Sequence, residues 1–195
     1  QVEDIWRLMD EVWDELECDN SRPAPQKLER FYNHPVWLLN GLFIEQDSVS
    51  MGHREAIKNW IETRKDTVRR VLDYGGGMGA LGFLVAKIGE RISVEIFEPY
   101  PNRVAEGRAQ KAGNVRFVHE PSGPYDCLLS IDVLEHVMEP LEVLGKMREL
   151  LRTGGYLIIA NNFSPVTKCH LPATFHFRFS FRFIARLMGL KREGP

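Results

Sequence analysis

VLDYGGGMG, residues 71–79, is the stretch that decides how this chain folds. A short apolar run ends at an acid, Asp73, and glycines then alternate at positions 75, 77 and 79. A helical pattern follows over residues 80–88 and stops at Gly89, which suits a left-handed helix cap. Because glycine carries no Cβ, a turn of this kind lets another molecule approach its backbone closely. The stretch predicts a strand, a ligand-binding turn and a helix in succession.

Two acids flank this turn and indicate the kind of ligand. Asp73 lies two residues before the first glycine, where its carboxylate can meet a ligand ammonium directly or through water. Glu98 ends the next predicted strand, 23 residues after Gly75. An acid at about that distance can accept both hydroxyls of a ribose. A glycine-rich turn with a ribose-binding acid predicts a nucleoside cofactor.

Two registers of the glycines compete. Gly77-x-Gly79-x-x-Gly82 matches the dinucleotide fingerprint, but it would force the strand through Asp73, Gly75 and Gly76, which is poor strand sequence. In the other register, residues 71–79 match at every position a short strand followed by a glycine-rich turn. The acid before the glycines favours a ligand that carries an amino acid over one that carries a pyrophosphate.

The pattern continues on both sides of the turn. Strands are expected at residues 71–74, 92–97, 114–118, 126–131 and 156–160, with helices at 80–88, 101–112 and 140–151. Strands that alternate with helices at short spacing predict a doubly wound, Rossmann-like parallel sheet. Right-handed crossovers place the carboxyl ends of the strands at one edge, and ligands of such sheets bind there.

The first part of the chain has a different pattern. Residues 2–17 have apolar side chains at helical spacing, residues 27–51 are mixed and aromatic, and a second helix is expected from about Gly52 through Arg64. We expect residues 1–65 to form a helical extension and residues 66–195 the ligand-binding domain. The extension could act as a lid, pack on the domain or form a homodimer contact.

Four ordered segments resemble class I S-adenosylmethionine (SAM)-dependent methyltransferases, especially small bacterial enzymes of the ubiquinone-biosynthesis type. They are residues 71–79, residues 94–99 (VEIFEP), residues 125–137 (YDCLLSIDVLEHV) and residues 150–160 (LLRTGGYLIIA). The resemblance covers about residues 65–163. It implies the class I methyltransferase fold, SAM as the cofactor and methyl transfer as the activity.

The resemblance also implies roles for individual residues. Asp73 would serve the methionine end of SAM, and Glu98, followed by Pro99, would bind the ribose. Asp132 and Val133 would line the sulfonium side of the pocket. The turn on which the cofactor lies would be formed by Gly75, Gly76, Gly77 and Gly79.

The chain departs from the family pattern at two places. Relatives often have an acid after the third strand that binds the adenine amine, and here only His119 and Glu120 could take that role. The family's sheet usually ends in two further strands that form an antiparallel hairpin. Since the chain ends at Pro195, we expect those strands to be missing through truncation at the C-terminus.

Methyl transfer from a sulfonium is an in-line displacement, which needs positioning and a dry site more than a dedicated acid. A general base matters only if the acceptor must lose a proton. The candidates are His136, after the fourth strand, and His170 and His176, after the fifth. Alternating phenylalanines over residues 175–183 indicate either an extended acceptor wall or core side chains of a helix over 181–188 that Ser180 caps.

Asp132, Glu135 and His136 also resemble the divalent-metal site of some ubiquinone-type and RNA 3′-end methyltransferases. The same string starts a helix in many relatives without a metal, so no metal is expected.

Composition bounds the remaining possibilities. The net charge of −2 gives no global basic field that would recruit nucleic acid, although residues 178–195 carry five bases against one acid. No apolar run reaches the ~18 residues that span a bilayer, so no membrane partner is expected. Three widely spaced cysteines, Cys18, Cys127 and Cys169, indicate neither disulfides nor a zinc site and favour the cytoplasm.

The sequence therefore predicts an enzyme that transfers a methyl group from SAM to a small-molecule acceptor, with oxygen preferred over nitrogen or carbon. The alternatives are an RNA or protein methyltransferase, a non-catalytic methyltransferase-like binding subunit and, disfavoured by register, a nicotinamide-dependent enzyme.

Overall fold

The computed structural model describes residues 1–193, and it contains one five-stranded parallel sheet of order β3-β2-β1-β4-β5. The strands are β1 (Arg70–Tyr74), β2 (Ser93–Phe97), β3 (Val115–Val118), β4 (Tyr125–Ile131) and β5 (Leu151–Ala160). The order reverses between β1 and β4, which is the switch point of a doubly wound sheet. The predicted Rossmann-like α/β class is confirmed.

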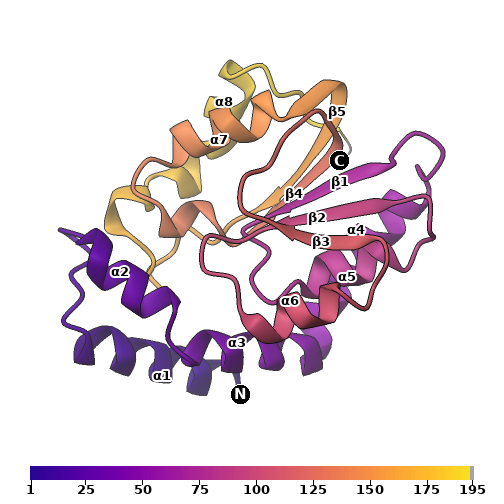
Figure 1. The fold of residues 1–195 in the computed structure, drawn as a ribbon. Helices are drawn as coiled ribbons and strands as arrows, with labels where there is room; N and C mark the ends of the chain where they lie inside the picture. Colours follow the sequence, from indigo (N-terminus) through magenta and orange to yellow (C-terminus); the bar gives the residue numbers. More distant parts are fainter. Residues whose placement is uncertain (194–195) are drawn as a thin grey trace.

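Helices cover both faces of the sheet (Figure 1). On one face lie α4 (Ser48–Glu62), α5 (Ala80–Ala86) and α6 (Arg103–Ala109), whose apolar side chains pack with Val71, Val94 and Ile96. On the other lie α7 (Pro140–Glu149) and α8 (Phe177–Leu187), which pack against Leu72 and Leu128. Successive residues of β1 and β2 therefore point into two separate apolar layers, as the period of two requires.

Several predicted boundaries are wrong for local reasons. Strand β5 begins at Leu151, five residues early, because Leu151 pairs with Tyr125 across an irregularity in the β4 ladder. Helix α6 begins at Arg103, because the Asn102 side chain accepts a hydrogen bond from the N–H of Val104 and caps the helix. Helix α4 begins at Ser48 rather than Gly52, because Asp47 caps it in the same way through Ser50.

Residues 1–47 form α1 (Val2–Glu15), α2 (Pro25–Tyr32) and α3 (Val36–Gln46), and the last two fall in the stretch that the sequence left as mixed and aromatic. These three helices gather at one end of the sheet (Figure 1). Met9, Trp13 and Phe31 pack with Cys169 and Leu171, which follow β5. The start of the chain is thus fixed to the loop beyond the last strand.

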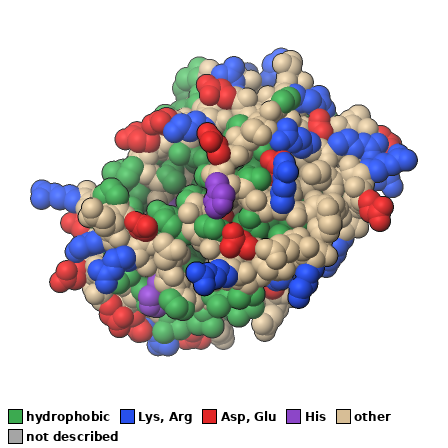
Figure 2. Space-filling view, in the orientation of Figure 1, with side chains coloured by type: hydrophobic (Ala, Val, Ile, Leu, Met, Phe, Trp, Pro, Cys, Tyr) green, Lys and Arg blue, Asp and Glu red, His purple; other side chains and the backbone are tan. Residues whose placement is uncertain are grey.

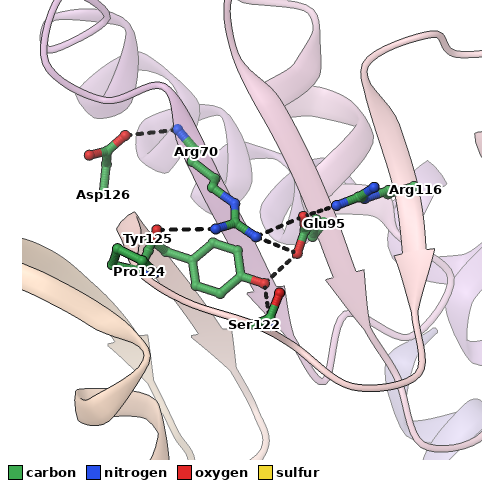
Figure 3. Close-up of polar contacts among 7 residues, drawn as sticks. All are labelled: Arg70, Glu95, Arg116, Ser122, Pro124, Tyr125 and Asp126. Atoms are coloured by element: carbon green, nitrogen blue, oxygen red, sulfur yellow. Dashed lines mark hydrogen bonds and ion pairs between the residues drawn. The ribbon is translucent and has the colours of Figure 1, made fainter.

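A polar network crosses the sheet near the start of β1 and β4 (Figure 3). Glu95 of β2 is only 2% exposed and accepts hydrogen bonds from Arg70, Arg116 and the hydroxyl of Tyr125. Burial opposes ionisation of Glu95, but the bonds from Tyr125 and the two arginines lower its pKa. Burial and the Glu95 carboxylate raise the pKa of Tyr125 to about 12. The network ties four strands together away from the glycine turn.

The segment after β5 contains a short 3-10 helix, η2 (Pro172–Thr174), and α8. No further strand lies among residues 161–193, and β5 forms an edge of the sheet. All three cysteines are free. Within residues 1–193, no helix has the length and apolar character needed to cross a membrane.

Candidate active site

A cavity of about 980 Å³ lies between the carboxyl ends of the strands and the N-terminal helices. Figure 2 shows hydrophobic side chains gathered on the side of the molecule where these helices lie. Ten of the predicted site residues line the cavity: Asp73, Gly75, Gly76, Gly77, Glu98, Pro99, Asp132, Val133, His136 and His170. Gly79, Glu135 and His176 are not part of its wall.

The glycine turn has the left-handed backbone that its sequence suggests. Gly75, Gly77 and Gly79 have φ values of +71°, +53° and +80°. A Cβ on Gly75 would lie 2.5 Å from a methyl of Val133, and one on Gly79 would lie 2.8 Å from the ring of Phe83. A Cβ on Gly77 would meet nothing within 4 Å. The sequence attributed all three glycines to ligand approach, and the structure adds close packing within the chain at two of them.

Asp73 is buried near the end of β1 and holds helix α5 against the turn. Its Oδ2 accepts a hydrogen bond of 3.0 Å from the N–H of Gly82 in α5. Burial raises the pKa of Asp73 to about 6, and the Gly82 bond only partly offsets this. A cation placed beside Asp73 would favour its ionised form, which suits the ammonium group predicted for that position.

Glu98 joins the turn to the end of β2. Its Oε2 accepts from the N–H of Gly77 at 2.9 Å, and its Oε1 accepts from the N–H of Tyr100 at 3.1 Å. Burial raises the pKa of Glu98. Each carboxylate oxygen can accept a second hydrogen bond, so the fixed carboxylate retains two places for a diol.

Asp132 and Val133 follow β4 directly. Asp132 has a left-handed backbone with φ of +54°. Burial raises the pKa of Asp132, and the positive charge of Arg54 partly opposes this effect. Asp132 lines the cavity at the switch point of the sheet, where the sequence placed it.

Three metal-ligating side chains converge beside the cavity. Glu135, His136 and His170 each offer one donor atom, and these atoms lie within 4.8 Å of one another. The sequence grouped Asp132 with Glu135 and His136, and the structure brings His170 there in place of Asp132. His170 lies beyond β5, so only the tertiary fold reveals this membership.

The hydrogen bonds of the two histidines fix their tautomers. Nδ1 of His136 lies 3.1 Å from the carbonyl of Cys169, and Nδ1 of His170 lies 2.7 Å from the carbonyl of Ser164. A carbonyl only accepts, so each Nδ1 carries the hydrogen and each Nε2 keeps its lone pair. Burial lowers the pKa of His136 to about 3 and also lowers that of His170. Both rings are neutral at pH 7.

Glu135 completes this group as a fully buried carboxyl. Its Oε1 accepts from the N–H of Asn162 at 2.6 Å, whereas Oε2 has no partner among the described residues. Burial raises the pKa of Glu135 to about 7. Two neutral imidazoles and an unpartnered carboxylate oxygen fit a divalent cation of the zinc or transition-metal type.

Of the two alternatives for the phenylalanines after β5, the extended acceptor wall is wrong. Residues 177–187 form helix α8, neither an extended piece nor a helix that starts at residue 181. Phe177 and Phe181 face the core, whereas Phe179 and Phe183 are exposed, and none of the four lines the cavity. His176 is exposed at the start of α8, so of the two histidines after β5 only His170 reaches the cavity.

Aromatic side chains of α2 and α3 also line the cavity, and among them the sequence did not single out Tyr32. Tyr32 stacks on Tyr100 with ring centroids 5.5 Å apart, and the Trp37 ring lies edge-on to His136 at 6.2 Å. The hydroxyl of Tyr32 and Nε1 of Trp37 are buried without a partner among the described residues. No periodic signal marked them, because they come from the two short unpredicted helices.

Arg54 of α4 also lines the cavity and was missed. Its Nη1 donates to the carbonyl of Ser50 at 3.0 Å. Burial lowers its pKa, whereas the charges of Asp132 and Asp73 raise it. The guanidinium forms no ion pair among residues 1–193. It is therefore available to an anionic group in the cavity.

Known proteins resemble this chain in sequence. The family described as a methyltransferase domain matches residues 51–178. A ubiquinone biosynthesis O-methyltransferase of Caulobacter sp. (strain K31) is 31% identical over 100 residues, which is 47% of this chain and 40% of that protein. The enzyme of the same name from Xanthomonas campestris pv. campestris (strain B100) is 30% identical over 129 residues, 61% of this chain and 52% of that protein. The chain spans about half the length of these curated relatives.

A solved structure resembles the fold. A Nostoc punctiforme PCC 73102 protein assigned as an O-methyltransferase matches with a TM-score of 0.62 at 18% identity, over 82% of this chain and 55% of that one.

Proposed function

We propose, since this chain belongs to the methyltransferase domain family, that it transfers a methyl group from SAM to a small-molecule acceptor, with oxygen as the methylated atom. The observation that carries the proposal is the glycine turn between Asp73 and Glu98, which opens into a cavity that the N-terminal helices close. The relatives named as O-methyltransferases favour oxygen.

The cavity offers complementary groups for the methionine and ribose parts of the cofactor, whereas His119 and Glu120, the candidates for the adenine, do not line it. When bound, SAM supplies an electrophilic methyl group on a sulfonium, with sulfur as the leaving atom. Asp73 would meet the methionine ammonium, and Arg54 would meet its carboxylate. Glu98 would accept the ribose hydroxyls, while Asp132 and Val133 would line the sulfonium side.

His170 is our candidate for the group that receives the acceptor's proton. It lines the cavity, its ring is neutral at pH 7, and the bond from Nδ1 to Ser164 leaves Nε2 free to accept. Nε2 of His170 would take the hydroxyl proton of the acceptor when the acceptor oxygen receives the methyl group and sulfur leaves. The helices α1 to α3 would exclude water.

A second chemistry, metal-assisted transfer, is favoured by the unpartnered Oε2 of Glu135. Glu135, His136 and His170 would hold the cation, which would lower the pKa of an acceptor hydroxyl. His170 would then be a ligand and not a base. A chelator should abolish turnover, with recovery on added Zn²⁺ or Mg²⁺, whereas full turnover in excess chelator contradicts this alternative.

Calorimetric titration tests the cofactor. We expect heat on addition of SAM and of its demethylated product, and none with NAD. Transfer of a labelled methyl group to metabolite pools then separates an enzyme from a non-catalytic binding subunit, and a parallel assay on RNA and protein tests those acceptors. Binding of NAD without binding of SAM contradicts the proposal.

Three broader expectations remain predictions. The cytoplasmic location is supported by the three free cysteines, and a biosynthetic role by the names of the relatives. A homodimer contact through the N-terminal helices also stays a prediction.

A further inference from the structure

Helix α8 presents an outer face covered with large apolar side chains. Phe179, Phe183 and Leu187 are 81%, 66% and 71% exposed, more than any other large hydrophobic side chain among residues 1–193. They are spaced four residues apart, so they form one stripe along the helix. The opposite face, with Phe177 and Phe181, packs against Phe163 and α7.

Arginines form a second stripe beside the first. Arg178, Arg182 and Arg186 are exposed and have the same spacing of four, each one residue before an apolar member. None forms an ion pair among residues 1–193, and the guanidinium of Arg178 lies 4.6 Å from the ring centroid of Phe179. Figure 2 shows basic and hydrophobic side chains next to one another at the top of the molecule, where α8 lies in Figure 1.

The charge beyond the helix has the same sign. Lys191 and Arg192 follow α8 and are exposed. Glu193 is the one acid in this stretch, and it pairs with Arg64 at 3.1 Å. The positive charge of the outer face is therefore uncompensated by acids of α8 or of residues 188–193.

We propose that the outer face of α8 binds the surface of an anionic lipid bilayer. A helix with phenylalanine and leucine on one side and arginine on the other lies in the plane of the interface, with its apolar side in the acyl boundary and its cations at the phosphates. Arginine side chains extend their apolar stems along such a surface while the guanidinium stays in the polar region.

Charge and shape favour a bilayer over other partners. In a symmetric contact between two copies of this chain, each α8 would bring its arginines near those of its partner, which costs energy. RNA would suit the arginines and the phenylalanines, but Leu187 offers no ring for a base to stack on. An anionic bilayer satisfies both stripes at once.

The absence of a spanning helix does not test this proposal. A surface helix needs no apolar run of membrane length, and α8 has only 11 residues. Its inner face packs on Phe163, which belongs to the loop that also carries His170 to the cavity. Docking of α8 would hold this loop of the active site next to the bilayer.

Vesicle flotation of this chain tests the proposal. We expect it to float with vesicles of mixed phosphatidylcholine and phosphatidylglycerol, to stay unbound with phosphatidylcholine alone, and to dissociate at high salt. The double variant Arg182→Gln/Arg186→Gln should bind roughly 25-fold more weakly, about fivefold per arginine. Phe179→Ser/Phe183→Ser should bind at least about tenfold more weakly.

Matched controls separate this face from the rest of the surface. Val49→Ser removes an apolar side chain that is 64% exposed on α4, and Arg91→Gln removes an exposed arginine before β2. Both should bind vesicles as the parent chain does. Circular dichroism and SAM titration should be unchanged in all four variants, because these residues lie outside the cavity. This readout keeps the test independent of the proposed function.

Several outcomes would overturn the proposal. They are failure of the parent chain to float with anionic vesicles, equal binding to neutral ones, and equal losses in the control variants. A dimer in sedimentation that only the phenylalanine variant abolishes would show instead that a second copy covers the face. Stronger binding to an RNA oligonucleotide than to anionic vesicles would assign it to nucleic acid.

Discussion

Asp73 and Glu95 are both buried acids of the central strands, yet their surroundings give them opposite properties. Asp73 has one backbone donor and a cavity beside it, so burial dominates and its pKa rises to about 6. Glu95 has three side-chain donors and no cavity, and its pKa is lowered. Asp73 can therefore accept further hydrogen bonds from a ligand, whereas the carboxylate of Glu95 already has its partners within the protein.

Asp73→Asn should weaken SAM binding by roughly 10- to 100-fold, the range for loss of a hydrogen bond to a charged group. The change keeps the size of the side chain and removes its negative charge. Calorimetry measures the effect, and Glu95→Gln, which alters a buried acid outside the cavity, is the matched control. Equal SAM affinity in the parent chain and in Asp73→Asn would remove the carboxylate from the cofactor site.

The same carboxyl predicts a pH dependence. Its pKa is raised from an ordinary value of 3.8 to about 6, so it is protonated in the free protein below that pH. SAM affinity should fall about tenfold per pH unit as pH drops through 6, and binding near pH 6 should release a proton. Calorimetry in buffers of different ionisation heat measures both effects. A similar fall in Asp73→Asn would assign the titration to another group.

His170 and His176 both follow β5, and they provide a test residue and its matched control. His170→Ala should lower turnover by about a hundredfold to ten-thousandfold with SAM affinity intact, because His170 lines the cavity with a free Nε2. His176→Ala should leave turnover unchanged, because His176 is exposed outside it. Measuring kcat together with the bound metal content of each variant distinguishes a general base from a metal ligand. Unchanged kcat in His170→Ala would reject both roles.

At the scale of elements, strands β1 to β4 depend on the Glu95 network. Glu95→Gln should destabilise the chain by roughly 3 kcal/mol, because it leaves Arg70 and Tyr125 without a charged partner in a buried site. Urea denaturation measures this difference in the free energy of unfolding. A loss below about 0.5 kcal/mol would show that the arginines are equally well satisfied by water.

The pKa of Glu95 is shifted in the direction opposite to that of Asp73, and its pH effect is on stability. The pKa of Glu95 is lower in the folded chain than its ordinary value of 4.5. Its contribution to stability is therefore complete above about pH 4.5 and is lost as pH falls through the lowered value. The stability difference between the parent chain and Glu95→Gln should shrink in that acidic range.

Helices α2 and α3 show why some elements escaped prediction. Helix α3 has no clean helical period, because it is apolar on most sides, and α2 has only eight residues. A Phe31 ring that is fully buried among Trp13, Tyr32 and Trp37 stabilises them instead. Tertiary packing, and not local pattern, holds these helices.

At the scale of the whole molecule, the cavity is bounded on one side because helix α1 contacts the loop after β5. Lys168 donates from its backbone to Asp10 at 2.8 Å and from Nζ to Asp14 at 2.7 Å. These partners are 158 and 154 positions apart in sequence. The contacts bring α1 against the loop after β5 and give the cavity its wall of N-terminal helices.

Ligand binding should therefore stabilise parts of the chain far from the glycine turn. SAM at 100 times its Kd should add about 2.7 kcal/mol to the free energy of unfolding. Hydrogen exchange should show the added protection in α2 and α3 as well as in the turn, because both walls line one cavity. Protection confined to residues 71–98 would mean that the N-terminal helices open independently of the cofactor.

The sequence by itself determined the parallel sheet, the glycine turn with Asp73 and Glu98, and the family. These features can be recognised from short segments, because strand and helix periods and left-handed turns depend on neighbouring residues. Only the tertiary structure placed Arg54 and Tyr32 at the cavity, brought His170 there and not His176, and turned Phe179 and Phe183 of α8 to the surface. The reason is physical: contacts between residues more than a hundred positions apart are set by how whole helices and strands pack, and no local pattern encodes them.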